Sequence, residues 1–210
     1  MEALVTDGPL YGVCCGSLDK LQRFVLPHAQ NRHVVALLNQ TSIASAYNRI
    51  IEVARDDVYP YLILQHDDLE ITDPRAEEKF EEVLEDPDVA LIGVAGGRNV
   101  HGLDWWNCET VGHQVIDSGM LDFGPRSGDV QLLEGSILVF SQWALDNLFF
   151  DPLPGFHSYD EVAFKALDLG KRVVVADVDT HHHTSLGFKS AVSEEAWHRG
   201  NDWFQRKWIL

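Results

Sequence analysis

The sequence predicts an α/β fold with a mostly parallel central sheet and helices on both faces. Short apolar runs bounded by polar residues, typical of buried strands, alternate with stretches whose apolar residues recur every three or four positions. The connections between these segments are short. Strands joined in this way through helices predict a parallel sheet that is covered on both faces. Ligands of such sheets bind beyond the carboxyl ends of the strands.

Seven apolar runs predict strands. In chain order they are Leu10–Cys15, His33–Leu38, Tyr61–Leu64, Val89–Val94, Val130–Leu133, Ile137–Phe140 and Val173–Ala176. Between Arg98 and Val130 the sequence is rich in Gly, Asp and Trp and has no sustained period. That segment is too long for an ordinary connection, which suggests a functional role.

Helical periodicity and helix-end signals predict the helices between these strands. The expected helices run from Ser17 to about Leu26, from Ile43 to Ala54, from Asp73-Pro74 to Leu84, from Ser141 to Leu148 and from Ser158 to Leu169. Pro27 ends the first helix, and Asp73-Pro74 offers an N-cap and a first-turn proline. Gly170 is the expected C-terminal glycine of the last of these helices.

Composition sets the class of protein. The chain has 210 residues, of which 45% are hydrophobic, and it shows no internal repeat or linker, so one compact domain is expected. A net charge of −17 argues against binding nucleic-acid phosphates or an anionic membrane. Three cysteines do not make a disulfide framework, and neither a signal peptide nor a membrane-spanning apolar run is apparent. We therefore expect a soluble, cytoplasmic protein.

An acidic cluster follows the Tyr61–Leu64 strand directly, in the order Gln65, His66, Asp67 and Asp68. Carboxylates crowded at the end of a buried strand repel one another and lose hydration. A divalent cation such as Mg²⁺ or Mn²⁺ offsets both costs. The simpler interpretation is a strand that runs into an acidic loop.

Two further segments carry side chains suited to catalysis or metal binding. Ser158 and Glu161 have the spacing of a capping box, which leaves Asp160 in the first helical turn as a general base or as a simple partner of the helix dipole. The run His181–His183 follows a predicted strand and favours metal binding, although only one or two of its rings can face a common point. Residues 184–193 are expected to form a mobile lid, and residues 194–210 to pack their aromatic side chains and offer basic groups to phosphate.

The order of these signals resembles the GT-A nucleotide-sugar glycosyltransferases, in particular the family-two-like group typified by the streptomycin-biosynthesis glycosyltransferase-like domain. The matching pieces are SIASAYNRIIEVA, LILQHDDLEI, LIGVAGGRN, DWW, VQLLEGSILVFS, GFHSYDEVAFKALDLGKRVVVADV, HHHTSLG and RKW, which together extend over roughly residues 10–208. This chain has His66-Asp67-Asp68 where the family more often has Asp-x-Asp.

The resemblance implies a single GT-A (Rossmann-like) domain over residues 1–210. Residues 1–97 would bind a nucleotide diphosphate-sugar such as a UDP-sugar, and residues 98–210 would carry the acceptor and catalytic part. The implied reaction is a metal-dependent transfer of the sugar to an acceptor hydroxyl with inversion, with Mn²⁺ or Mg²⁺ as cofactor.

The same resemblance implies roles for individual residues. Asp160 would be the catalytic base, with Glu161 next in line. Metal would be held by Asp68, His66 and one of His182 and His183. The implied donor contacts are Asn39, Asn48, Asp67, Gly96, Gly97, Glu134, Gly135 and Lys189, and Trp105 with Trp106 would form either an acceptor platform or plain core.

Other classes of protein remain open at this point. A sugar-nucleotide nucleotidyltransferase would normally show a Gly-rich, basic loop after the first strand, which Gly16–Asp19 does not supply. A metal-dependent hydrolase or oxygenase could use two histidines and a carboxylate, usually on an all-β scaffold. A sugar-binding module without activity would not need Asp160.

Overall fold

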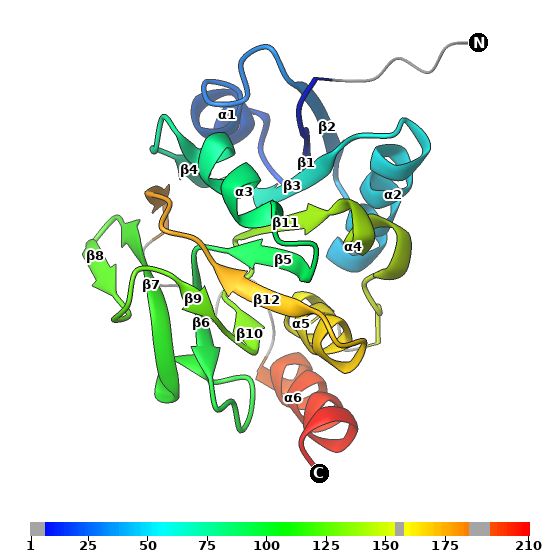
Figure 1. The fold of residues 1–210 in the computed structure, drawn as a ribbon, viewed down its shortest axis with the longest axis vertical. Coiled ribbons are helices and arrows are strands. Elements are labelled where there is room, and N and C mark those ends of the chain that lie inside the picture. The colour runs from blue at the N-terminus through cyan, green and yellow to red at the C-terminus, as the bar shows by residue number, and fades with distance from the viewer. Residues whose placement is uncertain (1–6, 154–157, 185–193) are drawn as a thin grey trace.

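The computed structural model describes residues 7–153, 158–184 and 194–210. A seven-stranded sheet forms its centre, and a smaller sheet lies beside it (Figure 1). In spatial order the central strands are β2 (His33–Leu38), β1 (Leu10–Cys15), β3 (Tyr61–His66), β11 (Ile137–Ser141), β5 (Val89–Gly93), β12 (Arg172–Val175) and β9 (Gly128–Asp129). The smaller sheet contains β10 (Leu132–Leu133), β6 (Ala95–Arg98), β7 (Glu109–Ile116), β13 (Thr180–His182) and β4 (Leu69–Ile71), with β8 (Gly119–Asp122) paired to β7.

Both sheets are mixed, so the prediction of a mostly parallel sheet is wrong. Strand β1 runs parallel to β2 and β3, whereas β11 runs antiparallel to both of its neighbours, β3 and β5. A helical crossover brings the chain back to the same edge and so gives parallel strands. The chain reaches β11 through the strands of the smaller sheet instead, and that route does not impose a parallel direction.

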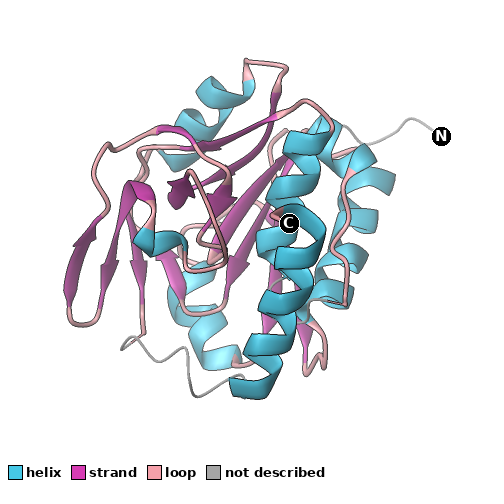
Figure 2. Cartoon of the chain, turned by 90° about the horizontal axis from the view of Figure 1, so that it is seen from below, coloured by secondary structure: helices cyan, strands magenta, loops and turns pink. Residues whose placement is uncertain are grey.

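Helices cover both faces of the central sheet, as predicted (Figure 2). They are α1 (Leu18–Lys20) with the π-helical turn η1 (Leu21–Val25), α2 (Ile43–Asp56), α3 (Ala76–Leu84), α4 (Gln142–Asn147), α5 (Ser158–Asp168) and α6 (Glu194–Trp208), with a short 3₁₀ turn η2 (Trp105–Asn107).

Because side chains alternate along a strand, Leu62 and Leu64 pack with α2, α4 and α5, while Ile63 packs with Phe80 of α3. His66 therefore continues the row of Leu62 and Leu64 and faces α5.

The segment between Arg98 and Val130 is not irregular, which corrects the sequence prediction. It contains η2, β7, β8 and β9, and the two longest strands, β7 and β8, form an antiparallel hairpin. Strand β7 buries His113 and Gln114 at 2% and 3% exposure. Those buried polar residues break the apolar alternation by which a strand is recognised in sequence.

Asp73 gives a prediction about acid stability. Its side chain is 7% exposed, accepts from the Arg75 backbone N–H at 2.9 Å and lies 2.5 Å from Lys79 Nζ. Burial alone would raise the pKa of Asp73, but the Lys79 ammonium and the Arg75 backbone N–H outweigh it and hold that pKa below its ordinary value. A depressed carboxyl pKa stabilises the fold above the unfolded-state pKa, and that stability is lost as the pH falls through the folded-state pKa.

We therefore expect Asp73→Asn to lower the free energy of unfolding by about 1–3 kcal/mol at pH 7. The difference from wild type should shrink below about pH 4, where the carboxyl group begins to protonate. Urea unfolding at pH 7, 5, 4 and 3 measures it, with the exposed Asp56→Asn as matched control. A difference that stays constant down to pH 3 would contradict this account.

Within the part of the chain that the structure describes, no helix is both long and apolar enough to cross a bilayer.

Candidate functional site

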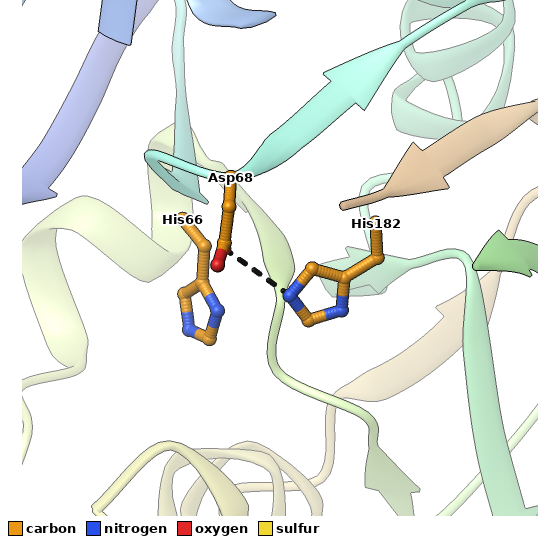
Figure 3. Close-up of side chains that lie close together, drawn as sticks. All are labelled: His66, Asp68 and His182. Carbon is orange, nitrogen blue, oxygen red and sulfur yellow. Dashed lines mark hydrogen bonds and ion pairs between the residues drawn. The ribbon is translucent and has the colours of Figure 1, made fainter. Parts of the chain in front are cut away.

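Three predicted metal ligands, His66, Asp68 and His182, meet beyond the end of β3 (Figure 3). One potential ligand atom from each lies within 4.8 Å of the others. His66 is the last residue of β3, Asp68 lies in the turn between β3 and β4, and His182 ends β13. Strand β13 pairs antiparallel with β4, which brings His182 beside that turn, with its Nε2 3.2 Å from Asp68 Oδ1.

The charges in this cluster suit a cation. Burial lowers the pKa of His66, and His182 lowers it further, so the His66 imidazole stays neutral. His66 Nε2 is buried and has no hydrogen-bond partner among the described residues. Burial would raise the pKa of Asp68, but hydrogen bonds from His182 and Lys20 outweigh it and hold it far below its ordinary value. Burial would lower the pKa of His182, but the carboxylates of Asp68 and Glu134 outweigh that effect and raise this pKa.

Lys20 belongs to this site and was missed by sequence reasoning. Its Nζ lies 2.9 Å from Asp68 Oδ2, and its side chain is 42% exposed. The sequence signal was the start of a helix directly after the first strand, with Ser17 as N-cap. A search for a glycine-rich basic loop passes over this arrangement, because here a single lysine in the first helical turn supplies the positive charge.

Asp67 and Glu134, both predicted as donor contacts, flank the cluster in different roles. Asp67 Oδ2 accepts from the backbone N–H groups of Gly16 and Ser17 at 2.8 and 2.7 Å, and so holds the turn between β1 and α1. Glu134 Oε1 lies 4.0 Å from His182 Nδ1, and its other oxygen accepts from the Ser136 backbone N–H. Glu134 is thus directed at the cluster, whereas the Asp67 carboxylate is engaged by backbone.

The first turn of α5 reaches the same place through Tyr159. The Tyr159 ring lies 6.4 Å from the His66 ring, and a Cβ at position 135 would collide with it. Gly135 also has a φ of +92°, so glycine is required there for two reasons. Burial and the neighbouring Asp160 carboxylate raise the pKa of Tyr159. Asp160 itself is 5% exposed and sits one residue beyond Tyr159 on this turn.

Glu161 is in a different environment from Asp160. It is fully buried, with Oε1 2.6 Å from Lys207 Nζ and Oε2 2.9 Å from Lys165 Nζ. The contact between Glu161 and Lys207, whose side chain is 38% exposed, joins α5 to α6. The predicted capping partner Ser158 has a side chain outside the described residues, so the capping box stays a prediction.

The structure gives a different setting to each of the other predicted donor contacts that it describes. Asn48 donates to the carbonyl of Phe150 and accepts from its N–H, and it thereby fixes the chain after α4. Asn39 is exposed, with a φ of +54°, at the end of β2. Gly96 and Gly97 lie in β6, where added Cβ atoms would meet Leu132 and Trp105.

The structure confirms some of the remaining predictions about histidines and aromatic residues and not others. His183 faces Glu70 and not the cluster, so of the two alternative histidines the structure places His182 there. Trp105 is 5% exposed and packs on Phe123, while Trp106 is 44% exposed, so the pair does not form one stacking platform. Three of the aromatic residues of α6 pack as predicted: Phe204 is fully buried, and Trp203 and Trp208 pack against the same cluster. Lys189 and the proposed lid lie outside the described residues.

Comparison with known proteins identifies the class. The fold resembles that of GT-A glycosyltransferases: a crystal structure of GalNAc-T7 with UDP, GalNAc and Mn²⁺ superposes with a TM-score of 0.59 at 11% identity, covering 84% of this chain and 44% of that one. The crystal structure of A197 from STIV gives the same TM-score and identity, covering 85% and 86%.

A sequence model of the glycosyltransferase-like family matches residues 3–197. The streptomycin biosynthesis protein StrF of Streptomyces griseus is 31% identical, over 90% of this chain and 73% of its own length. The chain therefore belongs to the glycosyltransferase-like family.

Proposed function

We propose that the chain is a metal-dependent glycosyltransferase that moves a sugar from a nucleotide diphosphate-sugar to an acceptor hydroxyl with inversion. The observation that carries the proposal is the juxtaposition of His66, Asp68 and His182 with the first turn of α5. Family membership supports sugar transfer as the reaction class. The oxygenase alternative loses its basis, because it expected an all-β scaffold and the fold is α/β.

The residues present fit a divalent cation. The buried His66 Nε2 has no hydrogen-bond partner among the described residues and so offers a free ligand atom. The Asp68 carboxylate would exchange its hydrogen bonds from Lys20 and His182 for the cation. Two imidazoles and one carboxylate favour Mn²⁺ over Mg²⁺, which prefers oxygen ligands throughout. When bound, the metal supplies Lewis-acid neutralisation of the charge on the departing nucleoside diphosphate.

The chain's own residues would do the rest. Lys20 is exposed enough to leave Asp68 and pair with diphosphate oxygens. Asp160 would accept the proton of the acceptor hydroxyl while that oxygen attacks the anomeric carbon from the side opposite the leaving diphosphate. Tyr159, which precedes Asp160 in the chain and lies beside His66, would exclude water from the donor site. The sequence-based assignment of Glu161 as second candidate base is weaker, because two lysines already hold its carboxylate.

A thermal-shift screen of nucleoside diphosphates tests the donor class. With Mn²⁺ present, a nucleotide at about 100 times its Kd should stabilise the protein by about 2.7 kcal/mol, which raises Tm by several degrees. We expect the shift to appear for one nucleotide, UDP by analogy with the ligand in the GalNAc-T7 structure, and to vanish with EDTA. An equal shift with and without metal, or none with any nucleotide, would contradict the proposal.

A further inference from the structure

The histidine run of β13 serves two faces of the smaller sheet. His182 points to the cluster around Asp68, so His181 and His183 share the opposite face, because neighbouring side chains of a strand alternate. In the antiparallel pairing with β4, His181 stands directly opposite Glu70. In the parallel pairing with β7, His182 stands opposite Ile116, which places Asp117, the next residue, beside His183. Strands β4 and β13, with the residues that directly follow β13 and β7, thus bring Glu70, His181, His183 and Asp117 near one another.

The potential ligand atoms of Glu70, His181 and His183 lie close together. His183 Nε2 lies 2.9 Å from Glu70 Oε2, and His181 Nε2 lies 3.4 Å from Asp117 Oδ1. The ligand atoms of Glu70, His181 and His183 all lie within 4.8 Å of one another. A tetrahedral Zn²⁺ with bonds of about 2.0–2.2 Å separates its ligand atoms by roughly 3.3–3.6 Å. Side-chain adjustment would therefore be needed to bring the ligand atoms of Glu70, His181 and His183 to these separations around one ion.

The surroundings hold the two imidazoles in place. The Phe24 ring stacks on His183 at 3.7 Å between centroids, and the His181 and His183 rings stack at 3.9 Å. His181 Nε2 is buried and makes no hydrogen bond within the described part of the chain. A cation would satisfy that nitrogen and offset two carboxylates in a protein that already carries a net charge of −17.

We propose that Glu70, His181 and His183 form a second metal site that binds Zn²⁺, with the Asp117 carboxylate beside the two histidines. Imidazole and carboxylate ligands in this number are those of zinc sites. The site is separate from the His66 cluster and does not depend on the proposed function. Because Glu70 lies in β4, His181 lies in β13 and His183 directly follows β13, the bound ion would cross-link these two strands and fix the direction of His182.

Zinc titration against a chromophoric chelator tests the site. A His66→Asn/Asp68→Asn background removes the first cluster, and that variant should still bind one equivalent of Zn²⁺. Adding His183→Asn or Glu70→Gln should weaken this binding by about 100-fold, since the loss even of groups that only orient a ligand costs about 10–100-fold. The exposed His101→Asn is the matched control and should change nothing.

A second measurement uses the wild-type protein, so the test survives a background variant that fails to fold. Anomalous diffraction from wild-type crystals grown with Zn²⁺ should show a peak between Glu70 and His183. If the first cluster binds no metal, the wild type binds one equivalent, and its loss in His183→Asn still supports the proposal. No anomalous peak there, or zinc binding unaffected by both His183→Asn and Glu70→Gln, would overturn it.

Discussion

Asp160→Asn is expected to lower turnover by about 100-fold to 10,000-fold, the range that a lost general base typically costs. Asparagine has the size of aspartate and can keep the hydrogen-bonding position in the first turn of α5, but it cannot accept a proton. Donor binding and Tm should stay near wild type, because the change leaves the His66 cluster intact. Steady-state transfer to a competent acceptor, with isothermal calorimetry of the nucleoside diphosphate, measures both quantities.

Two variants on the same helix sharpen this test. Asp168→Asn lies at the exposed end of α5 and should leave transfer unchanged. Glu161→Gln should instead lower the free energy of unfolding, by about 1–3 kcal/mol, because it removes the carboxylate that Lys165 and Lys207 contact. If Asp160→Asn retained more than about a tenth of the wild-type rate, another group would have to be the base.

Asp68→Ala is expected to abolish measurable metal-dependent binding of a nucleoside diphosphate. The variant removes the carboxylate that lies between His182 and Lys20, and without a cation the diphosphate meets a strongly acidic protein. Calorimetry should show clear binding to the wild type with Mn²⁺, much weaker binding with Mg²⁺, and none with EDTA. For the variant we expect an affinity at least about 100-fold lower with Mn²⁺.

The exposed Asp56→Asn, at the end of α2, is the matched control and should bind as the wild type does. Binding of equal strength by wild type and Asp68→Ala would refute the assignment of Asp68 to the metal. Binding that is lost in Asp68→Ala but does not require metal would instead point to Lys20 and the fold of the turn as its source.

The sequence was sufficient for features whose cause is local. The strand that leads into Asp68 and the helix that carries Asp160 follow from apolar runs and helix-end signals within a dozen residues. The placement of Asp68 follows from the general rule that ligands bind at the carboxyl ends of strands, and the first turn of α5 comes to the same edge through Tyr159. The sequence left both His182 and His183 as candidates for the metal ligand, because which of them faces Asp68 depends on the pairing of β13 with β4.

What could not be predicted depends on partners far along the chain. The side-chain amide of Asn48 donates to the carbonyl of Phe150, 102 residues away. Position 96 requires glycine because a Cβ there would collide with the backbone carbonyl of Leu132. Lys20 reaches Asp68 across 48 residues. The direction of β11 likewise depends on the route of the intervening chain and not on its own five residues.

Because three histidines are consecutive, a one-residue slip in the pairing of β13 with β4 would affect the His66 cluster and the Glu70 site differently. A slip of β13 by one residue against β4 would turn His181 or His183 toward Asp68, so the first cluster would still receive an imidazole. The opposite face would then keep a single histidine, His182. Zinc bound at Glu70 would therefore indicate that β13 pairs with β4 in its native register.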